Sequence, residues 1–305
     1  MIWREIRSVL SHRWTLICMG LCLLLFLGSN WDYFTSTSEY SINGTAVSLV
    51  QTPLALFNHI SASKIKYYLP MLCCLPAVFI ACEEWNSGFY RLQFTRMPWQ
   101  AFALRRIVAN AIAGSLVLFI PVLIMTALCF LRAPYENPYF PLASPLAQVA
   151  DYSIFPYEFG GRALTEQVFP AVFEKLQFAP LTAQELWELL SVVPAQEYAL
   201  AELRMIGVQL LGYGVFGMLW AMVGLAVSSW IPNRYITLAL PFAISFFLVG
   251  LLPEAITPLF RPYSIFNAFD EINYSYGVFY LVAACEFVFA AILYVTGMGR
   301  RVIHG

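Results

Sequence analysis

The stretch that decides the fold class is 205–233, MIGVQLLGYGVFGMLWAMVGLAVSSWIPN, which runs for 29 residues without Asp, Glu, Lys or Arg. A bilayer core about 30 Å thick is crossed by about 20 helical residues, so this stretch is long enough to span a membrane. Five further stretches of the same character are 14–31, 67–82, 107–131, 235–253 and 272–299. The last of these is interrupted only by Glu286. The sequence therefore predicts an all-α integral membrane protein with six transmembrane helices.

The composition of the whole chain agrees with this prediction. Hydrophobic residues make up 60% of the 305 residues and charged residues 11%, whereas about 25% of the residues of soluble proteins are charged. The net charge is −1, so no overall field attracts nucleic acid, and a lipid bilayer is the expected environment. The seven cysteines lie in apolar stretches and the three histidines are far apart. Neither a metal site nor a disulfide framework is predicted.

The distribution of basic residues predicts the orientation in the membrane. With six spans and both termini in the cytoplasm, ten arginines are cytoplasmic: Arg4, Arg7, Arg13, Arg91, Arg96, Arg105, Arg106, Arg234, Arg300 and Arg301. Five basic residues lie outside and near a span. Because cytoplasmic loops carry the excess of Lys and Arg, we expect both termini to be cytoplasmic. We expect the membrane to be a plasma membrane, and the protein to be bacterial.

Residues 40–63 are also free of charge, but only half of them are apolar. If they crossed the membrane, the arginines of segment 83–106 would face outward, against the positive-inside rule. We therefore expect an external loop at 40–63, which could include a helix lying on the membrane interface. Residues 2–13 repeat apolar side chains at helical spacing, among them Ile6 and Val9. This period predicts an amphipathic interfacial helix, and the alternative is a charged tail that only sets topology.

The predicted spans divide the chain into 1–131, an extracytoplasmic insertion at 132–204, and 205–305. The insertion is rich in proline, acidic and aromatic residues, and Pro194 is placed to start a helix that enters the fourth span. Its acidic surface fits a lid or binding surface over an exit pathway, or else a small cap whose aromatic residues fill its own core. Residues 254–271 contain two helix-breaking prolines among apolar residues, which favours a re-entrant or interfacial element.

Motifs for nucleotide binding and for nucleophilic catalysis are absent from the sequence. No G-x-x-x-x-G-K-[ST] loop and no G-x-S-x-G elbow occur. The pair Glu83–Glu84 invites comparison with the E-E-x-x-x-R motif of intramembrane CAAX-type proteases, but position 88 is Gly and no later histidine lies in a span. The chain is therefore not expected to be an enzyme.

Residues 83–106, EEWNSGFYRLQFTRMPWQAFALRR, are the informative stretch for function. The pattern predicts a second span that ends in the cytoplasm, a break at Gly88, a short amphipathic piece, and Pro98 before the third span. A basic, amphipathic element of this kind suits docking onto another protein at the membrane surface. The alternative is a solvated loop whose arginines only fix topology.

This stretch resembles the ABC-2 class of ATP-binding-cassette permeases. The residues that carry the resemblance are Glu83, Glu84, Gly88, Leu92, Thr95, Arg96, Pro98, Phe102 and Arg105. The amphipathic N-terminus, the six predicted spans and the proline-broken element before the sixth also match. The large insertion after the third span departs from the class, in which a short loop is more common.

The resemblance implies a coupling helix that sits in a cleft of a separate ATPase subunit. The residues expected at that contact are Glu83, Glu84, Gly88, Arg91, Arg96 and Pro98. It also implies a second permease half, identical or homologous, around a central pathway. ATP and Mg²⁺ would then be bound by the partner ATPase, and this chain would bind no cofactor directly.

Glu286 is the other candidate functional residue. A charged carboxylate at mid-bilayer costs at least about 2.5 kcal/mol, so we expect it to be protonated or paired. It lies either on the translocation path or half–half interface, or in a hydrogen bond with Gln209 or Thr126. Small residues four apart, such as Ala109 and Ala113, predict close helix contacts.

These features together predict the permease subunit of an exporter that works by alternating access. The alternatives are an ion-coupled secondary transporter and a membrane sensor that binds a ligand through residues 132–204. Against a secondary transporter, the sequence shows no inverted repeat and only one intramembrane acid.

Overall fold

The computed structural model describes residues 2–29, 31, 38–42, 45–49, 68–132, 195–231, 233–250 and 276–304. Eight helices lie within these ranges: α1 (Ile2–Leu10), α2 (Arg13–Ser29), α5 (Leu69–Ser87), α6 (Phe89–Phe94), α7 (Trp99–Arg132), α13 (Ala195–Trp230), α14 (Arg234–Gly250) and α16 (Tyr276–His304). The same ranges hold two short strands, β1 (Ser38–Ile42) and β2 (Thr45–Leu49). The described part of the protein is therefore mainly helical.

Each of the six apolar stretches coincides with a helix, but fewer than six are long and apolar enough to cross a membrane. Within the described ranges three helices meet that condition, over Trp99–Leu128, Leu210–Trp230 and Tyr280–Ile303. Helices α2 and α14 have 17 residues each, which is short of the roughly 20 that a bilayer core requires. Helix α5 has 19 residues, and its last turn and a half includes the polar sequence Glu83, Glu84 and Asn86. The described helices are thus compatible with a membrane protein but support three candidate spans rather than six.

The described helices agree with the expected all-α fold class, and the two strands at Ser38–Ile42 and Thr45–Leu49 are a local departure from it. Strands β1 and β2 pair in antiparallel register, with Ser38 opposite Leu49 and Ile42 opposite Thr45. The sequence between the strands is Asn43-Gly44, the dipeptide that two-residue hairpins favour. Part of the expected loop at 40–63 is therefore a hairpin, and residues 50–63 lie outside the described ranges.

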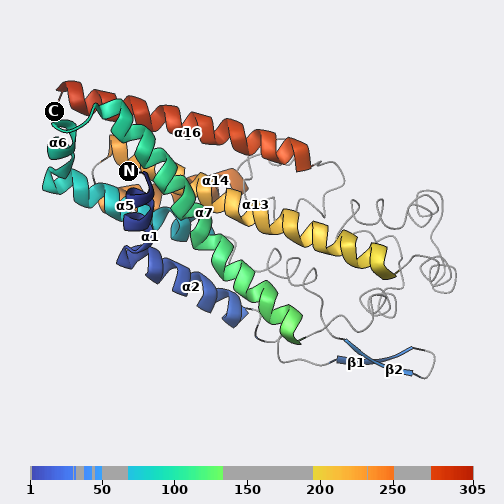
Figure 1. The fold of residues 1–305 in the computed structure, drawn as a ribbon. Coiled ribbons are helices and arrows are strands. Elements are labelled where there is room, and N and C mark those ends of the chain that lie inside the picture. Colours follow the sequence, from blue (N-terminus) through green and yellow to red (C-terminus); the bar gives the residue numbers. More distant parts are fainter. Residues whose placement is uncertain are drawn as a thin grey trace.

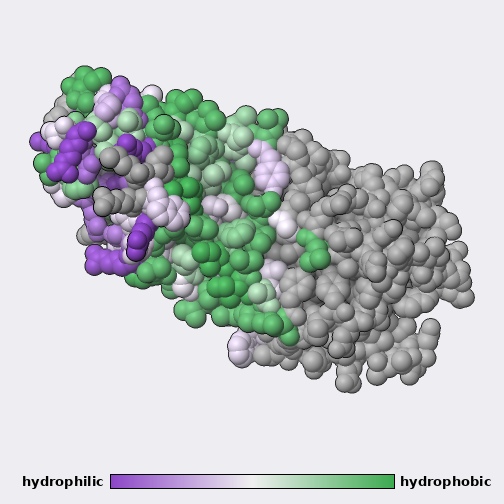
Figure 2. Space-filling model, in the orientation of Figure 1, coloured by the Kyte–Doolittle hydropathy of each residue, from purple (hydrophilic) through white to green (hydrophobic). Residues whose placement is uncertain are grey.

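The helices form one bundle whose two ends differ (Figure 1). Helix α13 packs against α5, α7, α14 and α16, and α1 lies against α7. Both termini and α6 lie at one end of the bundle, and the β1–β2 hairpin lies at the opposite end. Hydrophilic residues gather at the first end, while the middle of the visible face is mainly apolar (Figure 2). We call the end that holds α1, α6 and the last turns of α16 the polar end.

Helices α7 and α13 approach each other closely because glycines face one another. A Cβ atom on Gly114 would lie 2.7 Å from the carbonyl oxygen of Gly217 and would also collide with Ala221. The side chain of Asn110 donates a hydrogen bond to the Ala221 carbonyl at 2.9 Å. Such close backbone approach between small residues is typical of helix contacts in membranes.

The N-terminal amphipathic helix forms as predicted, but its apolar face is covered by protein. Ile6 and Val9 are buried together with Ala109 and Ala113 of α7. Trp3 on the outer side of α1 is 74% exposed. Helix α1 is thus docked across the first half of α7, and Trp3 is directed away from the bundle.

Two other predictions concern residues that lie largely outside the described ranges. Of the insertion at 132–204, only Arg132 and 195–204 are described, and the element expected at 254–271 lies wholly outside. Helix α13 starts at Ala195, directly after Pro194, and continues without a break to Trp230. The last ten residues of the expected insertion therefore belong to the same helix as the fourth apolar stretch.

Candidate functional site at the polar end

A left-handed glycine joins α5 to α6. Gly88 has φ 69° and ψ 10°, a conformation that L side chains rarely adopt and that commonly ends helices. Its N–H donates to the Trp85 carbonyl at 3.3 Å, and its own carbonyl accepts the N–H of Arg91 at 3.0 Å. The chain therefore ends one helix and begins the next within a single residue.

The link from α6 to α7 is a turn of four residues, 95–98. The hydroxyl of Thr95 donates to the Leu92 carbonyl at 2.8 Å, and the N–H of Arg96 donates to the Gln93 carbonyl at 3.0 Å. Pro98 stands just before α7, where its fixed φ suits a helix start, and its carbonyl accepts the N–H of Phe102 at 3.2 Å. Both ends of α6 are thus tied directly to long helices.

Helix α6 has an inner and an outer face. On the inner face the ring of Tyr90 lies 4.3 Å from the ring of Trp85, and Phe94 lies 5.6 Å from Phe102. On the outer face Phe89 is 42% and Leu92 is 63% exposed. Arg91 and Arg96 are exposed as well. The outer face therefore combines apolar and cationic side chains, while aromatic contacts hold the inner face against the bundle.

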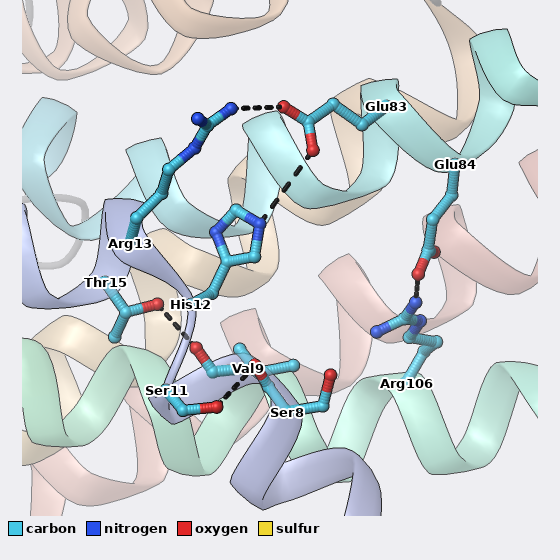
Figure 3. A network of polar contacts seen from close by, with 9 residues as sticks. All are labelled: Ser8, Val9, Ser11, His12, Arg13, Thr15, Glu83, Glu84 and Arg106. Atoms are coloured by element: carbon cyan, nitrogen blue, oxygen red, sulfur yellow. Dashed lines mark hydrogen bonds and ion pairs between the residues drawn. The ribbon is translucent and has the colours of Figure 1, made fainter.

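The adjacent carboxylates Glu83 and Glu84 have different surroundings (Figure 3). Glu83 is half exposed and lies 3.8 Å from both His12 Nε2 and Arg13 Nη2, at the junction of α1 and α2. Exposed pairs at this distance stabilise a protein weakly. Glu84 forms an ion pair with Arg106 of α7, and the two side chains are only 21% and 13% exposed. Glu84 is therefore a structural partner of α7, and Glu83 is a looser contact with the N-terminal helices.

A small cavity lies beside the Glu84–Arg106 pair. Its volume is about 20 Å³, which is room for one water molecule. The polar and aromatic residues that line it are Glu84, Trp85, Tyr90, Phe102, Arg106, Asn110 and Tyr294. Side chains from α5, α6, α7 and α16 thus meet at one point directly beneath α6.

The residues predicted to contact a partner therefore fall into two groups. Arg91, Arg96 and Pro98 are exposed on or beside α6, and Gly88 shapes its start. Glu83 and Glu84 instead face this chain's own basic residues. Sequence reasoning missed Phe89 on the outer face, although its spacing of three from Leu92 was a signal of a shared helix face.

Glu286 lies apart from this site. It is half-buried on α16, fifteen residues before Arg301, and so roughly 22 Å along the helix from the polar end. Within the described ranges its carboxyl group has neither an ion pair nor a hydrogen bond. The hydroxyl of Thr126 donates to the Val122 carbonyl at 2.8 Å, and within the described ranges Thr126 makes no hydrogen bond with Glu286. The side chain of Gln209 lies outside what the structure describes.

The outer face of α6 at the polar end presents apolar and cationic side chains that are suited to binding. Within the described residues, no group of three or more His, Cys, Asp or Glu side chains is placed to hold a metal ion. The buried carboxylate is engaged by an arginine, and the exposed face of α6 offers apolar and cationic contacts. No protein-family model and no curated protein matches this chain.

Proposed function

We propose that the chain is the permease subunit of an ATP-binding-cassette exporter, in which α6 docks onto a separate ATPase subunit. The observation that carries the proposal is that α6 has two different faces. Its inner face packs against Trp85 and Phe102, and its outer face exposes Phe89 and Leu92. The resemblance of residues 83–106 to ABC-2 permeases supports it. ATP and Mg²⁺ are bound on the partner.

The short links at both ends of α6 suit such a coupling role. A force applied to α6 is transmitted to α5 through Gly88 and to α7 through Pro98 without an intervening flexible loop. Helices α5 and α7 both contact α13. Displacement of α6 would therefore tilt helices that reach through the bundle, as alternating access requires.

The proposed topology has six spans, with α2, α5 and α14 as the short ones, and the polar end in the cytoplasm. Charge supports this orientation, since the described part of the polar end holds more arginines than acidic residues. A second permease half, identical or homologous, completes the transporter. Glu286 then lies on the translocation path or at the interface between the halves, because an intramembrane carboxyl faces protein or water.

An ion-coupled secondary transporter is the second candidate, and Glu286 is the observation that favours it. A single half-buried acid in an apolar helix could carry a proton across the membrane. This candidate predicts uptake or efflux driven by a proton gradient in vesicles without ATP. The exporter predicts that the gradient alone has no effect.

The test is co-purification of the native complex in mild detergent. We expect an ATPase chain with a G-x-x-x-x-G-K-[ST] loop to accompany the protein, and Leu92→Asp or Arg96→Glu to lower its recovery at least tenfold. Arg7→Glu is the matched control, because Arg7 is also exposed but lies on α1. Equal recovery with all three variants, or no ATPase in the native complex, would contradict the proposal.

A further inference from the structure

Arg301, in the last turn of α16, contacts two other helices of the polar end. The carbon of its guanidinium group lies 4.5 Å from the ring centroid of Trp85 in α5. Its Nη2 donates a hydrogen bond to the carbonyl of Ser228 in α13 at 3.2 Å. One side chain thus links α16, α13 and α5.

The Ser228 carbonyl is a natural acceptor for an arginine. Helix α13 ends at Trp230, and the last four carbonyls of a helix have no partner within it. The neighbouring Val227 carbonyl accepts the N–H of Ile231 at 2.9 Å. Arg301 therefore caps the C-terminal end of α13, where the helix dipole favours a cation.

The other contact of Arg301 leads to α6. The Trp85 ring, over which the Arg301 guanidinium group lies, is 4.3 Å from the ring of Tyr90 in the first turn of α6. Tyr90 in turn lies 5.7 Å from Phe94, at the end of the same helix. A continuous row of contacts therefore runs from the ends of α13 and α16 to the inner face of α6.

We infer that Arg301 is the positioning residue of α6. Stacking on Trp85 fixes the ring against which Tyr90 packs, and the hydrogen bond to Ser228 anchors that stack to α13. If α6 is the docking helix, as the proposed function has it, Arg301 also transmits displacement of α6 to α13 and α16. It does so from a position more than 200 residues away in the sequence.

The adjacent arginine provides a matched control. Arg300 is exposed, and its guanidinium carbon lies 5.6 Å from the centroid of Trp230 rather than over Trp85. A change at Arg300 therefore removes an equal charge from the same turn of α16 without removing the contact with α5.

The experiment is hydrogen exchange of the full chain in lipid nanodiscs, without any partner. We expect Arg301→Met to speed exchange of the amides of residues 89–97, which are α6 and the turn after it, by about five- to tenfold, as loss of a partly buried cation–π contact implies. Arg301→Lys should retain most of the protection, since it keeps a cation over the ring. Arg300→Met should leave these amides unchanged.

Two outcomes would overturn the inference. One is exchange of 89–97 that is the same in Arg301→Met as in the native protein. The other is an equal rise across α7 and α13, which would mean general loss of stability rather than loss of α6 positioning. Because no ATPase is needed, a changed exchange rate with no ATPase in the purified complex would refute the proposed function and leave the role of Arg301 standing.

Discussion

The polar end and the α7–α13 contact hold helices together by different means. At the polar end the contacts are an ion pair, a stacked arginine and a series of aromatic rings. Between α7 and α13 the backbones meet at Gly114 and Gly217, with one side-chain hydrogen bond from Asn110. Charged groups are tolerated where water is near, whereas in an apolar region close packing is the main source of affinity between helices. The two regions should therefore respond to different substitutions.

Loss of the Arg106 side chain should lower the free energy of unfolding more than a change at the glycine contact or at Glu286. Arg106→Met leaves the largely buried Glu84 carboxylate without its partner. Breaking a buried pair in this way destabilises a protein by about 3–5 kcal/mol, and because these side chains are still 21% and 13% exposed we expect a loss of about 3 kcal/mol. The free energy of unfolding, measured by titration from mild detergent into a denaturing one, tests this expectation. The double variant Glu84→Gln with Arg106→Met should regain most of the loss, because no uncompensated charge remains. Equal instability of the single and double variants would show that packing around Arg106, and not its charge, matters.

A methyl group in the α7–α13 contact should have the next largest effect. Gly114→Ala places a Cβ against the Gly217 carbonyl, so the helices must separate, at a cost of about 1–3 kcal/mol. Gly207→Ala is the control, since a Cβ there meets nothing within 4 Å. The control should be neutral or slightly stabilising, because alanine favours a helix more than glycine does. The same unfolding titration compares the two, and an unchanged stability in Gly114→Ala would mean that this contact is looser than described.

Replacing the carboxyl group of Glu286 in α16 by an amide should change the free energy of unfolding least. Glu286 has no ion pair in the described part of the chain, so Glu286→Gln should change the free energy of unfolding by less than about 0.5 kcal/mol. The measurement is the same titration, made on the purified chain alone. A loss above about 1 kcal/mol would reveal a charged partner. Loss of transport with unchanged stability would place Glu286 on the transport path.

Much of the helical content could be predicted from the sequence, and turn residues such as Gly88 and Pro98 marked several helix ends, but the apolar stretches alone do not give the full length of the helices. Apolar stretches mark where a helix lies in an apolar environment, and they end at the first charged residue. Helix α7 begins at Trp99, directly after Pro98 as the sequence predicts, and therefore includes Arg105 and Arg106, which precede the apolar stretch 107–131. Helix α16 similarly continues through Arg301, which is capped onto α13. Charge marks the edge of an apolar layer, and a helix can extend past that edge.

The contacts that build the candidate site needed the structure. The segment 83–106 is continuous, so its turn at Gly88 and its short helix follow from local spacing. The pairing of Glu84 with Arg106 depends on how α5 and α7 are rotated about their axes, which the sequence does not specify. The contact of Arg301 with Trp85 joins residues more than 200 positions apart in the sequence. The hairpin at 38–49 had a local signal in Asn43-Gly44, which the low apolar content of the stretch obscured.

The docking of α1 on α7 has a consequence for biosynthesis. Ile6 and Val9 find their buried surroundings against Ala109 and Ala113, and the ribosome adds those alanines roughly 100 residues later. At about 5–20 residues per second, the newly made α1 exists for on the order of 5–20 s before the surface on which it docks is synthesised. During that interval an apolar helix face is open to chaperones and to the insertion machinery. Helix α1 is therefore translated well before the surface on which it docks.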